Sequence, residues 1–463
     1  MRSHLTVLAD TVFDGFQFKE EPLIIEIEGD IISDIRPYEE EDSGGGILDA
    51  RGAIVIPGLI NTHTHLARGG MFDPNEVISV NQIVRNLRDL LRAGVTTVGE
   101  MGCAAGLVHS LRQHMSRHPS CGPSIVACGP LLTVKGGYPL DWMPPFFAAM
   151  GVALTCESEE EARRAVHKVK EMGMDQVKLV IMHRSYAEKP LRTISQGAAK
   201  AVVSEAHSLG FKVLVHAHWP EDYRLALDVG VDALMHSCFE PLDDELVERV
   251  KGSRVYVNPT LWVFEGALRG IENRYDCDPR YIRHVSRRVR RDWSEFCEAF
   301  EQSGDVIPAG IAGGLPKDRG REAIENTFDN FAKLREAGVP MALGSDASYG
   351  FCLVGRPVDE LSAMQRAGMS PEEVLTAATS NAAALLGYGD RGTLEAGKRA
   401  DMVIVDKETI RDVNALDRVR AVIKSGRLVE DSPFEQSVHT VQTTASIMGG
   451  MAKTALWSLI GRS

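Results

Sequence analysis

Short apolar runs alternate with longer amphipathic segments over most of the chain, from about residue 54 to residue 388. The short runs are rich in Val, Ile and Leu and are predicted to be β-strands. Eight such strand–helix units predict parallel strands joined by crossover helices, most simply a (β/α)8 barrel. The expected strands are Ile54–Ile56, Thr96–Gly99, Ile125–Leu132, Val177–Ile181, Val213–His216, Ala233–His236, Val255–Asn258 and Met341–Gly344.

The segments between these strands have helical patterns, and several of them end at a glycine, as helices commonly do. An open doubly wound sheet uses the same units, but no GxGxxG or GxxxxGK[ST] sequence supports one here. We therefore expect an α/β chain with a distorted barrel over residues 58–388. The clearest expected helices are Glu159–Glu171, Ala198–Leu209, Glu322–Glu336 and Pro371–Leu386.

Both ends of the chain carry short β-rich stretches that are too small to form a core alone. The economical interpretation is one small β-sandwich, built from residues 1–57 together with residues 389–431. Its last part is typical of a hairpin with a turn at Lys424-Ser425-Gly426-Arg427. Residues 432–463 predict a helical tail that covers a partner subunit, so we expect a homo-oligomer. The expected sandwich strands are Leu5–Ala9, Leu23–Glu28, Asp30–Ile35, Asp401–Val405 and Arg420–Ile423.

The composition excludes several classes of protein. There are 51 Lys and Arg against 64 Asp and Glu, which gives a net charge of −13. Binding to nucleic acid or to a membrane surface usually needs basic patches, so neither is expected. The eight cysteines form no CxxC pair, and no apolar run is long enough to span a membrane. We expect a folded protein of the reducing cytoplasm.

Two histidines follow the first apolar run and its Pro-Gly turn. His63 and His65 are separated by one residue, so on an extended chain their side chains face the same way and can reach one cation. The alternative is two ordinary surface histidines. Position favours the metal interpretation, because polar residues at the C-terminal ends of barrel strands build active sites.

Lys178 lies inside the apolar fourth strand. Burial lowers the pKa of a lysine because water no longer solvates the ammonium group. A neutral amine can add carbon dioxide and become a carbamate, an anion able to bridge two metal ions. The alternative is a lysine at a strand end whose amine extends to solvent.

More candidate ligands follow the fifth, sixth and eighth strands. His216, His218 and His236 are imidazoles of the kind that zinc and related ions prefer. Alternation places His216 and His218 on one face, so geometry alone does not choose between them. Asp346 is either a ligand that also accepts a proton or the N-cap of a helix. Taken together, these residues fall at the ends of strands one, four, five, six and eight, which predicts a metal centre.

With these motifs, the chain resembles the amidohydrolase superfamily of metal-dependent hydrolases, and most closely its branch of imidazolonepropionase-like proteins and Xaa-Pro or Xaa-Arg/Lys dipeptidases. The resemblance extends from about Leu23 to Glu430. It rests on Pro57-Gly58-Leu59-Ile60-Asn61-Thr62-His63-Thr64-His65, His216-Ala217, His236-Ser237, Pro259-Thr260-Leu261, Gly344-Ser345-Asp346-Ala347 and the run from Gly392 to Asp401.

The resemblance implies a binuclear centre. His63, His65 and Asp346 would hold the more buried ion, carboxylated Lys178 would bridge the two ions, and His216 with His236 would hold the second. His218 would then face the substrate or support a ligand. Zinc is the expected metal, although cobalt, manganese or iron suit the same ligands.

The expected reaction is hydrolysis of a C–N bond in an amide, peptide, urea or carbamate by metal-activated water. Asp346 would act as general base and then as general acid. The family often has Gly-Gly-His after the third strand, but this chain has Gly136-Gly137-Tyr138, so Tyr138 is the candidate donor to the substrate carbonyl. Arg184 is the candidate for binding a substrate carboxylate. The expected pocket walls are Trp142, Trp219, Trp262 and Phe264.

Two other functions remain open from the sequence. One is a mononuclear cyclic-amide hydrolase or deaminase of the imidazolonepropionase type, in which Glu221 would act as acid and base and Lys178 would be unused. The other is a non-catalytic scaffold related to dihydropyrimidinases. A full ligand set argues against the scaffold.

Overall fold

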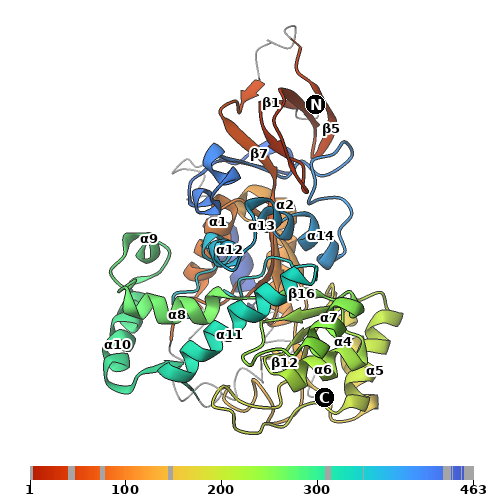
Figure 1. The fold of residues 1–463 in the computed structure, drawn as a ribbon. Helices are drawn as coiled ribbons and strands as arrows, with labels where there is room; N and C mark the ends of the chain where they lie inside the picture. The colour runs from red at the N-terminus through yellow and green to blue at the C-terminus, as the bar shows by residue number, and fades with distance from the viewer. Residues whose placement is uncertain are drawn as a thin grey trace.

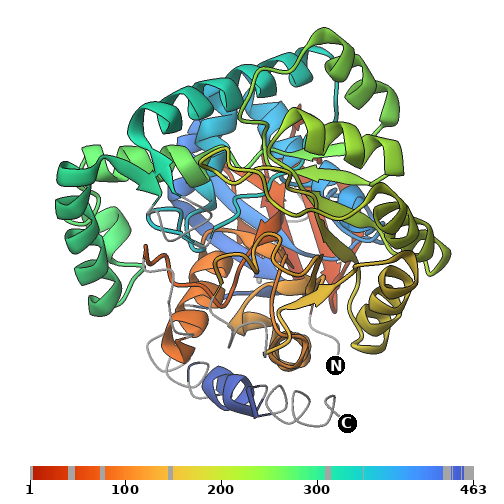
Figure 2. The ribbon, with the colours of Figure 1, turned by 90° about the horizontal axis from the view of Figure 1, so that it is seen from below.

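The structure is a computed structural model that describes residues 4–39, 47–72, 79–143, 150–307, 314–347, 349–430, 440, 442–449 and 451–452. It has two parts (Figure 1). Both ends of the chain build a β-sandwich, and the residues between these ends in the sequence build a barrel of strands and helices. Seen at right angles to that view, helices surround the strands of the barrel (Figure 2). The predicted α/β architecture is confirmed.

Two sheets make the sandwich. The first has the order β5-β4-β1-β6, and the second has the order β21-β20-β19-β7-β2-β3, so C-terminal strands pair with N-terminal ones. The composite sandwich is thereby confirmed. Its strands are β1 (His4–Ala9), β2 (Val12–Phe13), β3 (Phe18–Lys19), β4 (Leu23–Glu28), β5 (Ile31–Pro37), β6 (Ile47–Asp49), β7 (Ala53–Pro57), β19 (Met402–Asp406), β20 (Val419–Lys424) and β21 (Arg427–Leu428).

The prediction that Ile54–Ile56 is the first barrel strand is wrong. These residues belong to β7, which pairs with β19 and β2 in the sandwich, and the first barrel strand is β8 (Leu59–Thr64). Gly58 divides the two strands and lies against the next barrel strand. A Cβ atom on Gly58 would lie 2.2 Å from Thr96 Oγ1, so only glycine fits at this close approach.

The barrel strands are parallel. In one sheet β8 pairs with β9, which pairs with β10, and in the other the order is β12-β11-β13-β14-β15-β16. The segment from Met341 to Ala347 closes the ring, because it bridges Val257 on one side and Thr64 on the other. These strands are β9 (Val95–Glu100), β10 (Ser124–Ala127), β11 (Leu131–Thr133), β12 (Ala153–Thr155), β13 (Val177–Val180), β14 (Val213–His216), β15 (Ala233–Met235) and β16 (Tyr256–Asn258).

Helices cover the outside of the barrel. Several begin at a serine or aspartate whose side chain accepts a backbone N–H of the first turn, as Ser158 does for α4. The expected helix Pro371–Leu386 is divided in two around Thr379. The helices are α1 (Val80–Arg92), α2 (Ala105–Arg117), α4 (Glu159–Glu171), α5 (Gln196–Ser208), α6 (Pro220–Val229), α7 (Asp244–Ser253), α11 (Lys317–Glu336), α12 (Pro357–Arg366), α13 (Pro371–Ala377) and α14 (Ser380–Leu386).

An insertion extends the barrel between β16 and the closing segment. It contains α8 (Trp262–Glu272), α9 (Pro279–Ile282), α10 (Arg287–Ser303) and the short pair β17 (Asp305–Ile307) and β18 (Leu315–Pro316). Three 3-10 helices complete the described elements: η2 (Pro119–Cys121), η3 (Lys407–Ile410) and η4 (Val413–Asp417).

The described part of the C-terminal tail is helical and packs against the chain's own α2. Thr443 Oγ1 lies 3.1 Å from His114 Nε2, and Ser446 donates a 3.0 Å hydrogen bond to the carbonyl of Ser110. Figure 2 shows this helix outside the barrel. A contact between the tail and a partner subunit stays a prediction, and tail residues 432–439, 441, 450 and 453–463 lie outside the described residues. Of the helices that are described, none combines the length and apolar character needed to cross a membrane.

A buried ion pair connects β20 of the sandwich with the residue before β19, and it also contacts the barrel. Lys424 Nζ lies 2.6 Å from Asp401 Oδ2 and 3.0 Å from Ser124 Oγ on β10. Both charged side chains are almost inaccessible, with exposed fractions of 2% and 3%. Their mutual contact offsets the cost of removing two charges from water.

We therefore predict that Lys424→Met lowers the free energy of unfolding by about 3 kcal/mol, because it leaves the carboxylate of Asp401 buried without its cation. The control is Lys251→Met, which removes an exposed pair with Glu248 and should cost under about 1 kcal/mol. Urea unfolding of both variants tests this. Equal effects of the two substitutions would contradict it.

Candidate metal centre

The C-terminal ends of the barrel strands surround a cavity. β8 carries His63 and is followed by His65, β13 carries Lys178, and β14 ends at His216. His236 directly follows β15, and Asp346 lies in the closing segment. All six residues predicted as metal ligands line this cavity: His63, His65, Lys178, His216, His236 and Asp346.

One group of donors gathers around Asp346 Oδ1. This oxygen lies 3.0 Å from His65 Nε2 and 3.3 Å from His63 Nε2. Lys178 Nζ lies 3.4 Å from the same nitrogen of His63. Two imidazoles, a carboxylate and an amine thus converge in one part of the cavity.

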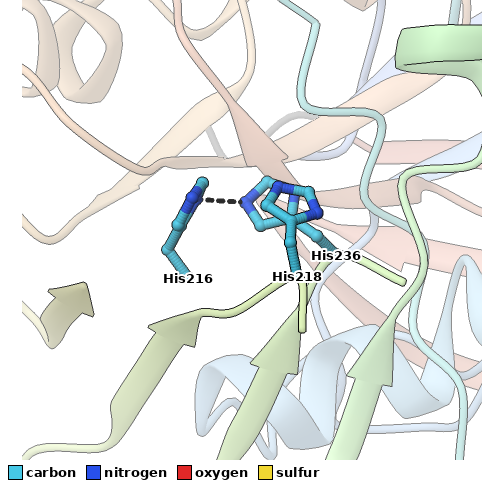
Figure 3. A group of neighbouring side chains, drawn as sticks. All are labelled: His216, His218 and His236. Carbon is cyan, nitrogen blue, oxygen red and sulfur yellow. Dashed lines mark hydrogen bonds between the residues drawn. The ribbon is translucent and has the colours of Figure 1, made fainter. Parts of the chain in front are cut away.

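A second group is formed by three histidines from two neighbouring strands (Figure 3). His216 Nδ1 and His236 Nε2 are 2.8 Å apart, and the other ring nitrogen of His236 lies 3.1 Å from Thr260 Oγ1. His218 stacks on His236 at a centroid distance of 4.5 Å and on Phe239 at 4.4 Å. Among the described residues, the lining of the cavity includes His216 but not His218.

The protonation states suit a divalent cation. Burial lowers the pKa of His63, His216 and His236 well below the usual value, so these imidazoles are neutral at physiological pH. Three buried imidazole nitrogens, His63 Nδ1, His216 Nε2 and His218 Nε2, have no hydrogen-bond partner within the described residues. Neutral imidazoles beside a carboxylate are the donor set that Zn²⁺ and related ions bind, so the residues present fit a metal.

Lys178 is the most unusual charge in the cavity. Its exposed fraction is 2%, and burial lowers its pKa to about 8. An appreciable part of the amine is therefore neutral at cellular pH, and only a neutral amine can add carbon dioxide.

Backbone strain is concentrated at the ends of these strands. His236, Thr260 and Asp346 have positive φ angles of 89°, 48° and 49°. Such angles cost about 1–3 kcal/mol each in residues other than glycine and persist only where the surroundings fix them. The strain lies at the residues that carry the donors, as in many functional sites.

Tyr138 lies beside the second group. Its ring stacks on His216 at a centroid distance of 4.5 Å and an interplanar angle of 13°. Burial raises the pKa of Tyr138, so the phenol keeps its proton. Tyr186 donates a 3.3 Å hydrogen bond to the Tyr138 oxygen, which leaves the O–H of Tyr138 to donate elsewhere in the cavity.

The structure does not bring all of the predicted substrate-binding residues to the cavity. Arg184 donates to Glu221 and Glu240 at 2.7 and 2.8 Å and stacks on Trp219, so its charge is already paired. Of the four aromatic side chains expected as walls, the cavity lining in the described part of the chain contains Trp142 alone. The three outside it are Trp219, Trp262 and Phe264.

Sequence reasoning missed two charged residues of the cavity, Glu100 and Arg68. Glu100 ends β9 and accepts the backbone N–H groups of Leu66 and Gly102 at 2.5 and 3.2 Å. Burial raises its pKa. The signal was available, because a glutamate at the end of an apolar strand is a polar residue at the C-terminal end of the barrel. Arg68 follows His65 by three residues in a loop of irregular structure, where no pattern marks it.

Comparisons with known proteins find similar chains over most of the sequence. The family model described as "Amidohydrolase family" matches residues 54–429. An imidazolonepropionase of Alkaliphilus metalliredigens is 22% identical over 427 residues, which cover 83% of each chain. A Xaa-Pro dipeptidase crystallised with bound methionine superposes with a TM-score of 0.74 and 24% identity over 93% of this chain and 100% of the other. The ochratoxinase of A. niger superposes with a TM-score of 0.71 and 18% identity over 93% and 96%.

Among the described residues, His216 lines the cavity and His218 does not. We therefore predict that replacing the two histidines has different effects on metal binding. His216→Asn should weaken the binding of divalent metal by more than about 100-fold. Loss of a residue outside the coordination sphere typically weakens it by about 100-fold at most, so a larger effect indicates a ligand. His218→Asn should weaken it by less than about tenfold, because His218 stacks behind His236. Metal content after dialysis, measured by atomic emission, checks this. A greater loss in His218→Asn would reverse the assignment.

Proposed function

The chain belongs to the amidohydrolase family, and from this membership we propose that it hydrolyses a C–N bond of a small amide-like substrate at a centre of two divalent metal ions bridged by carboxylated Lys178. The observation that carries the proposal is the convergence of His63, His65, Lys178 and Asp346 within 3.0–3.4 Å contacts in one cavity. The chain is therefore a hydrolase in class, and the finer statements below are proposals.

Each candidate ligand has one place in this proposal. His63, His65 and Asp346 would hold one ion, His216 and His236 would hold the other, and the carbamate of Lys178 would lie between them. When bound, the ions supply Lewis acidity that polarises the substrate carbonyl and lowers the pKa of water. Zinc is the proposed metal, because neutral imidazoles dominate the donor set.

Asp346 is the proposed proton carrier. Its oxygens face both donor groups, since Oδ1 lies 3.0 Å from His65 Nε2 and Oδ2 lies 3.7 Å from His236 Nδ1. A carboxylate in this position can take the proton of the attacking water and return it to the departing nitrogen. Tyr138 would donate its free O–H to the substrate carbonyl oxygen, where negative charge develops.

The walls of the cavity indicate the class of substrate. Apart from the polar donors and the charged residues Arg68 and Glu100, the lining is apolar, and it includes one tryptophan and three methionines. Flexible thioethers and an indole favour an apolar group without charge beside the scissile bond. We therefore propose an amide, urea or carbamate with an aryl or alkyl arm. The apolar residues are Ala67, Met101, Cys103, Ala104, Leu131, Pro139, Trp142, Met143, Met150, Val152 and Val180.

A mononuclear deaminase or cyclic-amide hydrolase is the less favoured function. It would need Glu221 as acid and base, but both carboxylate oxygens of Glu221 accept hydrogen bonds from Arg184, at 2.7 and 3.0 Å. The imidazolonepropionases among the relatives keep this alternative worth testing. A non-catalytic scaffold would have no use for a cavity of neutral imidazoles.

A panel of small amides tests the proposed reaction. We predict that the metal-loaded protein hydrolyses N-aryl or N-alkyl amides, ureas or carbamates in preference to analogues with a charged arm. Asp346→Asn should lower kcat by about 10²–10⁴-fold, the range for loss of a general acid–base. A chelator should abolish turnover, and Glu221→Gln should retain it. Background rates on the whole panel with metal loaded would favour the scaffold.

Metal stoichiometry tests the bridging lysine. The parent protein, reconstituted with bicarbonate, should bind two ions per chain, whereas Lys178→Ala should bind at most one and lose activity. The matched control is Lys212→Ala, since Lys212 lies outside the cavity lining, where its Nζ donates to the carbonyl of Ala384 at 2.7 Å and lies 6.0 Å from the centre of the Tyr256 ring. One ion per chain in the parent, with an active Lys178→Ala variant, would instead support the mononuclear enzyme.

A further inference from the structure

The loop after β16 carries a buried carboxylate contact that the proposed mechanism does not use. Glu360, on α12, has an exposed fraction of 0%. Its Oε1 accepts the backbone N–H of Leu261 at 2.9 Å, and its Oε2 accepts that of Trp262 at 2.7 Å. Both N–H groups belong to the start of α8, where the orphan donors and the helix dipole favour a negative charge.

The residue immediately before these two N–H groups is Thr260, and it contacts a candidate ligand. Thr260 Oγ1 lies 3.1 Å from Nδ1 of His236, whose Nε2 faces His216. A ligand histidine needs a partner for its second nitrogen, because that partner fixes the tautomer and the ring orientation. Thr260 can play this part only if its backbone stays where it is.

The backbone conformation of Thr260 depends on contacts with its neighbours. Its φ angle of 48° is unfavourable for a β-branched residue, and such an angle persists only where neighbouring contacts impose it. On one side, the carboxylate of Glu360 accepts hydrogen bonds from the backbone N–H groups of the next two residues, Leu261 and Trp262. From the other side, the carbonyls of Asn258 and Pro259 accept the backbone N–H groups of His236 and Ser237 at 2.8 and 3.0 Å.

We infer that Glu360 is a positioning residue for the metal centre: by fixing the backbone at Leu261 and Trp262 it holds the Thr260 hydroxyl against His236 and so keeps that imidazole directed toward His216. The inference rests on the proposed function, because it gives His236 a metal to bind. Burial raises the pKa of Glu360, and the N–H groups of Trp262 and Leu261 oppose that shift because they favour the carboxylate.

A second buried glutamate, close to the start of α8, provides a matched comparison. Glu265, on α8, is also buried, but its carboxylate pairs with the guanidinium groups of Arg269 and Arg366. Its loss removes a buried charge from α8 while leaving the Leu261 and Trp262 contacts in place. It therefore separates general destabilisation of α8 from displacement of Thr260.

The experiment is a double-mutant cycle on metal binding by the full chain. Co²⁺ is titrated into chelator-treated parent, Glu360→Gln, Thr260→Val and the double variant, and binding is followed by visible absorption. Glutamine keeps the shape but turns a donor group toward one N–H. We expect each single substitution to weaken the binding of the second Co²⁺ alone, by about 10–100-fold. The double substitution should weaken that binding no further.

Two controls define the outcome. Glu265→Gln should leave both Co²⁺ affinities within about twofold, and Thr260→Ser, which keeps the hydroxyl, should restore most of the loss seen in Thr260→Val. Additive effects of Glu360→Gln and Thr260→Val would overturn the inference. An unchanged affinity for the second Co²⁺ in either variant would overturn it as well. If Glu360→Gln does not fold, the result for Thr260→Val still decides, because an unchanged affinity removes the link. A parent that bound no Co²⁺ would overturn the proposed function as well.

Discussion

Buried carboxylates that accept backbone N–H groups hold the loops at the C-terminal end of this barrel. Glu100 holds the loops after β8 and β9, Asp222 those after β13 and β14, and Glu360 the one after β16. Burial raises the pKa of all three, because a charge that leaves water loses its hydration. Each carboxylate recovers part of that loss from two or more N–H groups. The rest of the site depends on these contacts, since the candidate ligands lie on or beside the same loops.

Held in this way, the site can keep an arrangement that the free backbone would avoid. His236 and Asp346 occupy positive φ angles, and the imidazoles are buried close enough together that a proton on one repels its neighbours. Both features cost free energy in the absence of a cation. Both also prepare the side chains for one, because neutral nitrogens and a fixed carboxylate need no rearrangement on binding. A site of this kind exchanges some stability for preorganisation.

The sequence predicted the parts whose signals are local. β14 and α4 begin and end where the pattern of apolar residues places them, and the two-residue turn at Ser425 and Gly426 has the positive φ angles of a hairpin. The carboxylate contacts could not be predicted, because Glu360 and Leu261 are 99 residues apart and the partner is a backbone group that no sequence pattern marks. For the same reason, the sequence could not predict that the charge of Arg184 is paired. Only the fold brings its two glutamate partners to it.

The candidate metal ligands and the candidate substrate contacts lie on different elements of this chain. The candidate ligands end strands that the barrel fixes, whereas Tyr138 and Trp142 lie on the connection between β11 and β12. Strand ends tolerate little change, since each is paired with two neighbours, but a connecting segment on the surface can change its residues without moving the strands. The tyrosine that stands in place of the histidine expected after Gly136-Gly137 is a change of this kind. In the proposed function, this change would alter the group that meets the substrate and leave the candidate metal donors in position, so that one fold could act on different amides.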